Sequence, residues 1–380
     1  MTNTWATGLS SSKSGAQAPL EHRPLPVEDA PWLVQYDLGP DRGRQLRQDL
    51  AQRPWTLWRY RELLPVERAD ERIDLGEGGT PLVALKRLFR TGIEVWVKQE
   101  SGNPTGSFKA RGLSLAVNRA RELGAPGVEL RSAGNAALAA TAYAAAAGLP
   151  CRVALPADTP AVITARCRLH GAQVLSGGRT LVEAAERLAD TDLGYWDLST
   201  FKEPYRVEGK KTMGYELAEQ LGWTLPDWIV YPTGGGTGIV AMAKAFEELR
   251  QLGLLEGDHC RFVVVQMEGC SPVVEAFRLG AEEMTPWAEP DTDVWGLRVP
   301  GSVADFLILR ALRQSQGTAV VVAENSVQEM QQKAAKEEGL TVGPEGAAAL
   351  LGAQQLVEEG VIGKGDRVVI FQTGDPANYS

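Results

Sequence analysis

Short apolar segments alternate with alanine-rich segments from about residue 112 onward. Strands are expected at 128–130, 151–155, 173–175, 228–231, 262–266, 319–322 and 367–371. Helices are expected at 112–123, 136–147, 161–169, 180–189 and 239–249. Strands that alternate with helices form a mostly parallel sheet with helices on both faces, and ligands bind at the carboxyl ends of its strands. The sequence therefore predicts an α/β fold with its functional residues in strand-to-helix turns.

The composition excludes several classes of protein. The chain has 380 residues, enough for two domains, and 44% of them are hydrophobic and 23% charged, as in globular proteins. A formal net charge of -9 without a basic patch argues against a nucleic-acid binder. No apolar run reaches the length of a membrane span, and the four cysteines and three histidines show no zinc-binding spacing. We therefore expect no nucleic acid, membrane or metal partner, and the unpaired cysteines favour a cytoplasmic protein.

Residues 1–18 are rich in Ser, Thr, Gly and Ala and lack the apolar core of a secretory signal. This composition predicts a disordered or loosely attached tail over residues 1–25. An organelle transit peptide is the alternative, but residues 1–18 contain no Arg, in which such peptides are rich.

A single lysine follows a glycine- and proline-rich turn in the run SGNPTGSFKARG, residues 101–112. Lys109 comes directly after Phe108 and stands at the head of a predicted helix. A lysine held there loses part of its hydration, which lowers the pKa of its amine and frees it for imine formation. The alternative is a solvated lysine beside a turn, because strongly perturbed lysines are rare.

The run Ser132-Ala133-Gly134-Asn135 follows the strand at 128–130 and opens the next helix. An asparagine at this point can donate to an anionic ring oxygen or a carboxylate while neighbouring N–H groups face the same ligand. The alternative is a helix cap, a position that asparagine often takes.

A second turn follows the strand at 228–231 and contains Gly234, Gly235, Gly236, Thr237 and Gly238. Consecutive glycines let several backbone N–H groups converge on one anion, and the dipole of the following helix adds to the attraction. The turn has no basic residue and is therefore not a Walker loop, and it does not fit the dinucleotide fingerprint. A purely structural glycine-rich turn is the alternative.

A third segment carries the residues that bear on the substrate. Arg206 lies in the run YRVEGKKT, residues 205–212, shortly after Ser199 and Thr200. Its guanidinium can bind phosphate or carboxylate through two parallel hydrogen bonds, whereas a surface ion pair is the alternative. Glu345, in a small-residue run, is either a residue near a ligand or a carboxylate that stabilises a helix start.

Together and in this order, these segments resemble the motifs of the threonine synthase and threonine dehydratase family, which is fold type II of the pyridoxal-phosphate (PLP) enzymes. The resemblance covers roughly residues 55–380. It implies the tryptophan synthase β-like fold: two open, mostly parallel twisted sheets flanked by helices, with the active site between two domains. Residues 26–112 and 211–380 would form the larger, PLP-binding domain, and residues 113–210 the smaller α/β domain.

The resemblance also implies the roles of individual residues. Lys109 would form the imine with PLP. The other implied cofactor contacts are Phe108, Asn135, Gly234, Gly235, Gly236, Thr237, Gly238 and Thr373. The implied substrate contacts are Ser132, Ala133, Gly134, Ser199, Thr200 and Arg206. A neutral hydroxyl such as that of Thr373, facing the pyridine nitrogen, favours elimination and replacement chemistry. Residues 375–379 depart from the T-G-x-G-L-K pattern of threonine synthase relatives, so their role stays open.

The implied function is a PLP-dependent lyase that converts O-phosphohomoserine and water into threonine and phosphate by β,γ-elimination and replacement. An ammonia-lyase acting on threonine, serine or another β-substituted amino acid is the runner-up. Ala133 and the three consecutive glycines favour the ammonia-lyase, whereas Arg206 and Glu345 favour the synthase. A PLP-binding homologue without turnover and a glycine-rich nucleotide binder are further alternatives, against which Lys109 and its turn argue. We expect a small amino-acid substrate and a homodimer.

Overall fold

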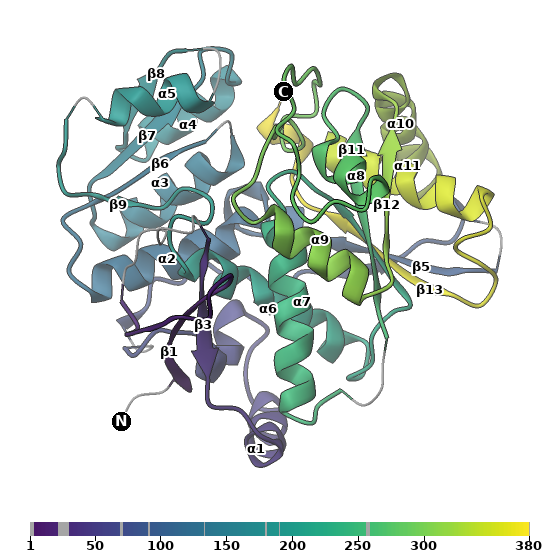
Figure 1. Ribbon diagram of the computed structural model, residues 1–380, viewed down its shortest axis with the longest axis horizontal. Coiled ribbons are helices and arrows are strands. Elements are labelled where there is room, and N and C mark those ends of the chain that lie inside the picture. The colour runs from purple at the N-terminus through teal and green to yellow at the C-terminus, as the bar shows by residue number, and fades with distance from the viewer. Residues whose placement is uncertain are drawn as a thin grey trace.

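The computed structural model describes residues 4–21, 30–68, 71–89, 92–132, 134–178, 181–189, 191–255 and 259–379. Two open, parallel-rich sheets lie side by side, each flanked by helices, and a small antiparallel sheet lies near the N-terminus (Figure 1). The predicted α/β fold with two sheets is therefore confirmed. Among the described residues, no helix is both long enough and apolar enough to cross a membrane.

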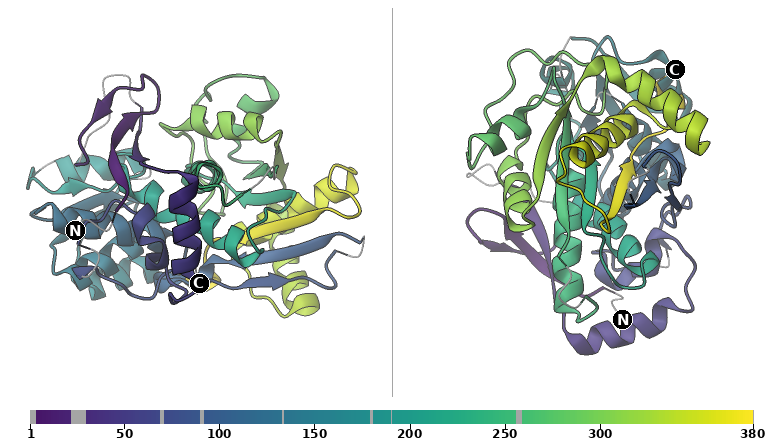
Figure 2. Two further views of the ribbon diagram at one scale, coloured as in Figure 1. Left: turned by 90° about the horizontal axis from the view of Figure 1, so that it is seen from below. Right: turned by 90° about the vertical axis from the view of Figure 1, so that its right-hand side faces the viewer.

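The larger sheet has six strands in the order β12-β11-β10-β13-β5-β4. Their bounds are β4 (Leu82–Ala84), β5 (Glu94–Gln99), β10 (Trp228–Pro232), β11 (Arg261–Met267), β12 (Thr318–Val322) and β13 (Arg367–Gln372). All neighbours are parallel except β4 and β5. The inner strands are rich in Val and Ile because helices cover both faces of the sheet (Figure 2). Since β10 and β13 are parallel neighbours, the loops that follow them leave the sheet at the same edge.

The smaller sheet has four parallel strands in the order β8-β7-β6-β9. Their bounds are β6 (Val128–Arg131), β7 (Cys151–Leu155), β8 (Gln173–Ser176) and β9 (Trp196–Asp197). The alternation of apolar and alanine-rich segments predicts the first three. It does not predict β9, because two residues are too short to form an apolar run.

Eleven α-helices occur in the described part of the chain. They are α1 (Pro40–Leu50), α2 (Lys109–Glu122), α3 (Asn135–Ala147), α4 (Ala161–Leu169), α5 (Leu181–Ala189), α6 (Tyr205–Gln220), α7 (Thr237–Gln251), α8 (Pro272–Arg278), α9 (Asp305–Gln314), α10 (Val327–Glu338) and α11 (Pro344–Glu358). Short 3₁₀ helices are η1 (Leu57–Leu63), η3 (Glu100–Gly102), η4 (Pro104–Gly106), η5 (Glu324–Ser326) and η6 (Pro376–Asn378).

Helices α2 and α6 approach each other so closely that their contact requires glycine. A Cβ atom at Gly209 of α6 would lie 2.0 Å from the carbonyl oxygen of Arg111, and one at Gly112 of α2 would lie 2.8 Å from that of Arg206. This contact brings the start of α2, which carries Lys109, next to α6. The predicted domain boundaries after residues 112 and 210 fall inside these two helices, and the division into domains stays a prediction.

The N-terminal segment contains strands, so the prediction of a disordered tail over residues 1–25 is wrong there. Strand β1 (Ala6–Ser11) pairs antiparallel with β2 (Gln17–Ala18) and with β3 (Trp32–Tyr36). Leu9 of β1 is fully buried and belongs to the core formed by α2, α3 and the smaller sheet. The Ser, Thr and Gly content conceals this strand, because few of its side chains are large and apolar.

Candidate active site

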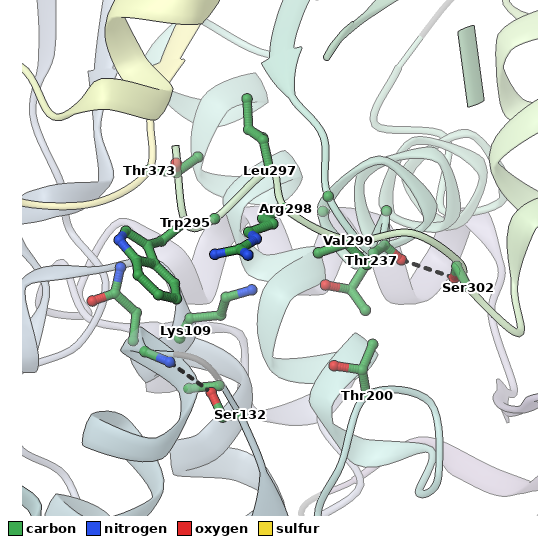
Figure 3. Close-up of a pocket in the computed structure, with 18 of the residues that line it drawn as sticks. Lys109, Ser132, Thr200, Thr237, Trp295, Leu297, Arg298, Val299, Ser302 and Thr373 are labelled. Carbon is green, nitrogen blue, oxygen red and sulfur yellow. Dashed lines mark hydrogen bonds between the residues drawn. The ribbon is translucent and has the colours of Figure 1, made fainter. Parts of the chain in front are cut away.

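A pocket of about 260 Å³ (Figure 3) is lined by residues that follow β6 of the smaller sheet and β10 and β13 of the larger sheet. Of the site residues predicted from the sequence, it brings together Phe108, Lys109, Ser132, Gly134, Asn135, Ser199, Thr200, Gly234, Gly235, Gly236, Thr237, Gly238 and Thr373. Arg206 is buried behind the pocket and does not line it. Ala133 lies outside the described residues.

The turn before Lys109 is fixed by its own backbone and by the loop that follows β13. Thr105 and Gly106 both have positive φ, 63° and 73°, which makes the turn tight and, at the threonine, strained. The backbone N–H of Phe108 donates to the carbonyl oxygen of Thr373 over 3.1 Å. Lys109 is consequently the first residue of α2, and its amine extends into the pocket.

The surroundings of Lys109 favour its neutral amine. Burial, and after it the nearby Arg206 cation, lower the pKa of Lys109 to about 8, although the Glu345 carboxylate opposes both effects. The amine lies 4.6 Å from the centroid of the Phe108 ring. At neutral pH the neutral fraction of this amine is therefore much larger than that of an ordinary lysine, and it can act as nucleophile or base without a separate activating group.

We expect the reactivity of Lys109 in the ligand-free protein to rise with pH through a midpoint near 8. Only the deprotonated amine reacts with an acylating reagent, so the labelled fraction of the Lys109 peptide, followed by mass spectrometry, should trace this titration. Arg206→Met should move the midpoint upward, because it removes a positive charge that disfavours protonation. A wild-type midpoint at or above 10, the range of an ordinary lysine, would rule out this electrostatic account.

The glycines of the turn between β10 and α7 serve two different purposes. A Cβ atom at Gly234 would lie 2.3 Å from the carbonyl oxygen of Gly296, and one at Gly236 or Gly238 would lie 2.0 or 2.2 Å from a buried side-chain atom of Ile308 or Tyr231, so packing favours glycine at these three positions. A Cβ atom at Gly235 would have Thr200 as its nearest neighbour, at 3.5 Å. Packing leaves room for a Cβ atom at Gly235, and the space beside it belongs to the pocket.

Helix α7 starts directly after this turn and presents an anion site. Its N-cap is Gly236, in the left-handed conformation, and no side chain of the described residues caps the helix. The first N–H groups of a helix lack partners within it and carry the positive end of the helix dipole. An uncapped N-terminus beside an open glycine turn therefore fits a phosphate group.

Arg206 is 1% exposed, so the alternative interpretation as a surface ion pair is wrong. Its Nη1 donates to the carbonyl oxygen of Leu198 over 2.6 Å. Its Nε and Nη2 are buried without a hydrogen-bond partner among the described residues. Burial lowers the pKa of Arg206, and the carboxylates of Glu203 and Asp197 oppose this effect. A buried guanidinium with two unused nitrogen atoms has the chemistry to hold an anion.

Asn135 does not cap helix α3, whose N-cap is Gly134. Its Nδ2 donates to the Tyr379 hydroxyl over 2.8 Å, and its Oδ1 accepts from Nδ2 of Asn378 over 2.8 Å. The Tyr379 hydroxyl in turn donates to Oε1 of Glu345 over 2.7 Å. Burial raises the pKa of Glu345, and its Oε2 has no partner in the described part of the protein. The segment whose role the sequence left open therefore orients the amide of Asn135.

The loop between α8 and α9 supplies pocket residues that the sequence did not predict. Trp295 and Arg298 extend into the pocket beside Lys109 (Figure 3). Arg298 pairs with Asp158 of the smaller-sheet region, with Nη1 and Oδ2 3.2 Å apart. This loop follows no strand, so a search of strand-to-helix turns passes over it. A sequence search for arginine near tryptophan and glycine would have found this loop, but it would also have matched many segments that line no pocket.

Comparison with known proteins identifies relatives over most of the chain. The family described as pyridoxal-phosphate dependent enzymes matches residues 73–374. Threonine synthase of Methanosarcina acetivorans is 40% identical over 84% of this chain and 79% of its own. Threonine synthase of Methanocaldococcus jannaschii is 35% identical over 89% of this chain and 84% of its own. Among solved structures, the threonine deaminase of T.th. has a TM-score of 0.65, 25% identity, and coverage of 79% of this chain and 94% of that chain.

The pocket fits pyridoxal phosphate, which carries an aldehyde, an aromatic ring and a phosphate monoester. A lysine amine with a lowered pKa suits the aldehyde, and the uncapped start of α7 beside Gly235 suits the phosphate. The family match covers the lysine turn, the glycine turn and Thr373. The chain belongs to the family of pyridoxal-phosphate dependent enzymes.

Proposed function

We propose that the protein is a threonine synthase, a PLP-dependent lyase that converts O-phosphohomoserine and water into threonine and phosphate. The observation that carries the proposal is the buried guanidinium of Arg206, which has two unpartnered nitrogen atoms close behind a pocket lined by Ser199 and Thr200. A phosphorylated substrate would supply the missing anion. The identity to two threonine synthases over more than four fifths of this chain supports the same assignment.

Each pocket residue has a task in this reaction. Bound PLP supplies an aldehyde for the substrate amine and a ring that withdraws electrons from the neighbouring carbon. The Lys109 amine takes the proton from the α-carbon and returns protons later, a role for which a pKa of about 8 is suitable. Thr373 lines the pocket at the place proposed for the ring nitrogen, and Asn135 is held by Tyr379 and Asn378.

The net change defines what the substrate site must hold. The bond between the γ-carbon and the phosphate oxygen breaks and phosphate leaves, the γ-carbon gains a proton in its place, and the β-carbon loses one hydrogen and gains the hydroxyl of water, whose proton leaves with the phosphate. Ser132 and Gly134 would bind the substrate carboxylate, and Ser199, Thr200 and Arg206 would bind its phosphate. The Ser132 hydroxyl already accepts from the N–H of Gly134 over 3.2 Å, which fixes this turn.

Arg206→Ala should lower kcat/KM for O-phosphohomoserine by about ten- to a hundredfold, because charge-assisted bonds to a phosphate contribute about 1.5–3 kcal/mol. Arg206→Lys should restore little, since an ammonium lacks the planar fork. Phosphate release, measured by a coupled assay, gives this readout. Any activity on serine or threonine serves as the internal control and should be nearly unchanged.

The same assay separates the synthase from the ammonia-lyase. Phosphate release that is intact in Arg206→Ala would remove the role assigned to this residue. Wild-type protein that forms an oxo-acid from threonine or serine but releases no phosphate would replace the synthase with the ammonia-lyase, which the threonine deaminase structure keeps as the second candidate.

We further propose that two copies assemble as a homodimer in the cytoplasm. All four cysteines are buried, and Cys151, Cys167 and Cys270 are free thiols, which suits a reducing compartment. Sedimentation of the purified protein tests the dimer directly.

A further inference from the structure

A second lysine stands behind the glycine turn. Lys210 of α6 lies one helical turn after Arg206 and is 0% exposed. Its Nζ donates to Oγ1 of Thr237 over 2.6 Å. Thr237 is the first residue of α7, directly after Gly236, and lines the pocket. The glycine turn, which has no basic residue in sequence, is therefore reached by a lysine from another helix.

Lys210 differs from its neighbour in how its charge is balanced. Lys211 is equally buried but pairs with Glu208 over 2.6 Å and Glu248 over 2.9 Å. Lys210 forms no ion pair within the described ranges, and Thr237 is its hydrogen-bond partner there. A buried ammonium without a counter-ion is costly, so an unbalanced buried lysine at a binding pocket indicates a ligand of opposite charge.

The groups around Lys210 leave this charge unbalanced. Burial, and after it the cations of Arg206 and Lys109, lower the pKa of Lys210 well below its usual range, and the Glu203 carboxylate opposes them only in part. Glu203 is itself committed to the start of α6, where it accepts the backbone N–H groups of Tyr205 and Arg206. Burial also raises the pKa of Glu203 to about 7, so at neutral pH its negative charge is incomplete.

We infer that Lys210 belongs to the phosphate site of the cofactor and holds the phosphate monoester through the hydroxyl of Thr237. The ammonium donates to Oγ1 of Thr237, which leaves the hydroxyl proton free to donate to a phosphate oxygen. Gly235 provides the open space, and the start of α7 provides the N–H groups. This inference rests on PLP as cofactor, which the proposed function requires, but not on threonine as product.

The phosphate could also come from the substrate, since both carry the same monoester. Thr237 adjoins the glycine turn, whereas the residues proposed for the substrate phosphate lie on the segment 199–206. We therefore assign Lys210 to the cofactor and let the experiment separate the two sources.

The test compares Lys210→Met with Lys211→Met in apoprotein titrated with PLP or with pyridoxal, which lacks the phosphate. Lys210→Met should weaken PLP binding by about 10- to 100-fold and leave pyridoxal binding unchanged, because the positive charge that supports the Thr237 hydroxyl and attracts the phosphate is lost while the ring and aldehyde contacts remain. Its apoprotein should melt no lower than wild type, since an unbalanced buried charge is removed. Lys211→Met should show the opposite pattern: lower melting temperature and unchanged preference for PLP.

Several results would overturn the inference. Unchanged PLP affinity in Lys210→Met removes the residue from the cofactor site. Unchanged PLP affinity with a raised KM for O-phosphohomoserine assigns Lys210 to the substrate phosphate instead.

If Lys210→Met does not fold, Lys210→Gln, which keeps a donor for Thr237 but not the charge, carries the same comparison. If Lys210→Met binds PLP more weakly than the wild type, but the wild type forms no threonine from O-phosphohomoserine, the proposed function is refuted and this inference stands.

Discussion

Lys109→Ala is expected to reduce threonine formation by at least about 10⁴-fold, because one change removes both the covalent link to the cofactor and the base that moves the α-proton. Proton transfer by a positioned side chain contributes about 10²–10⁴-fold by itself. Threonine formation, measured by chromatography, gives the rate, and the visible absorbance of the lysine-bound cofactor should disappear. PLP should still bind through its phosphate, since the start of α7 is untouched.

The control for this variant is Lys336→Ala, which removes an exposed lysine from α10 and should leave the rate unchanged. The covalent site can be located independently by borohydride reduction of the wild-type enzyme and peptide mapping. If the label were found on Lys210, the other lysine beside the pocket, and not on Lys109, the assignment of Lys109 as the lysine that binds the cofactor would be wrong.

The second large effect should be on stability, in Arg111→Met. Arg111 pairs with Glu100 over 2.7 Å and with Glu216 over 3.1 Å, and all three side chains are 0% exposed. Burial raises the pKa of Glu216, but the cations of Arg111 and Lys98 outweigh this effect and lower it to about 2. Without Arg111, two buried carboxylates share Lys98 as their cation. We expect the free energy of unfolding to fall by about 3–5 kcal/mol, because one partner is removed from a buried ion network.

Denaturant unfolding of the apoprotein measures this loss, with Arg44→Met as control. Arg44 and Asp41 form an exposed pair, whose removal should change the free energy of unfolding by about 1 kcal/mol or less. The wild type should also lose stability as the pH falls from 4.5 toward 2, because the unfolded chain protonates Glu216 first. If the free energy of unfolding fell by less than about 1 kcal/mol in Arg111→Met, the buried ion pairs of Arg111 would not be a major source of stability.

Local sequence patterns located much of the site, and the reason is geometric. Lys109, Asn135 and the glycines 234–236 each follow a strand, and parallel strands direct such turns to one edge of a sheet. The fold class followed from this local pattern alone, whereas the roles of the residues that line the pocket came from the resemblance of these turns to a known family.

The residues that the sequence did not place come from segments without that pattern. Tyr379 reaches Asn135 from 244 positions away, and Arg298 enters on a loop that follows no strand. Lys210 sits inside a helix, where nothing local distinguishes it from Lys211. Only the packing of α6 against α2 and α7 gives the two neighbouring lysines different surroundings. Strand β1 was missed for a related reason, since its burial depends on a distant helix.

The glycine contact between α2 and α6 sets the distance between two amines. Lys109 starts one of these helices and Lys210 lies on the other, and there is no side chain at Gly112 or Gly209 to compress or shift. The packing of the two helices therefore fixes the spacing of the backbones of Lys109 and Lys210. This spacing limits the length of a ligand whose aldehyde lies at one lysine and whose phosphate lies near the other. Cofactor recognition therefore also depends on two glycines that do not line the pocket, because their close packing positions the helices that carry both lysines.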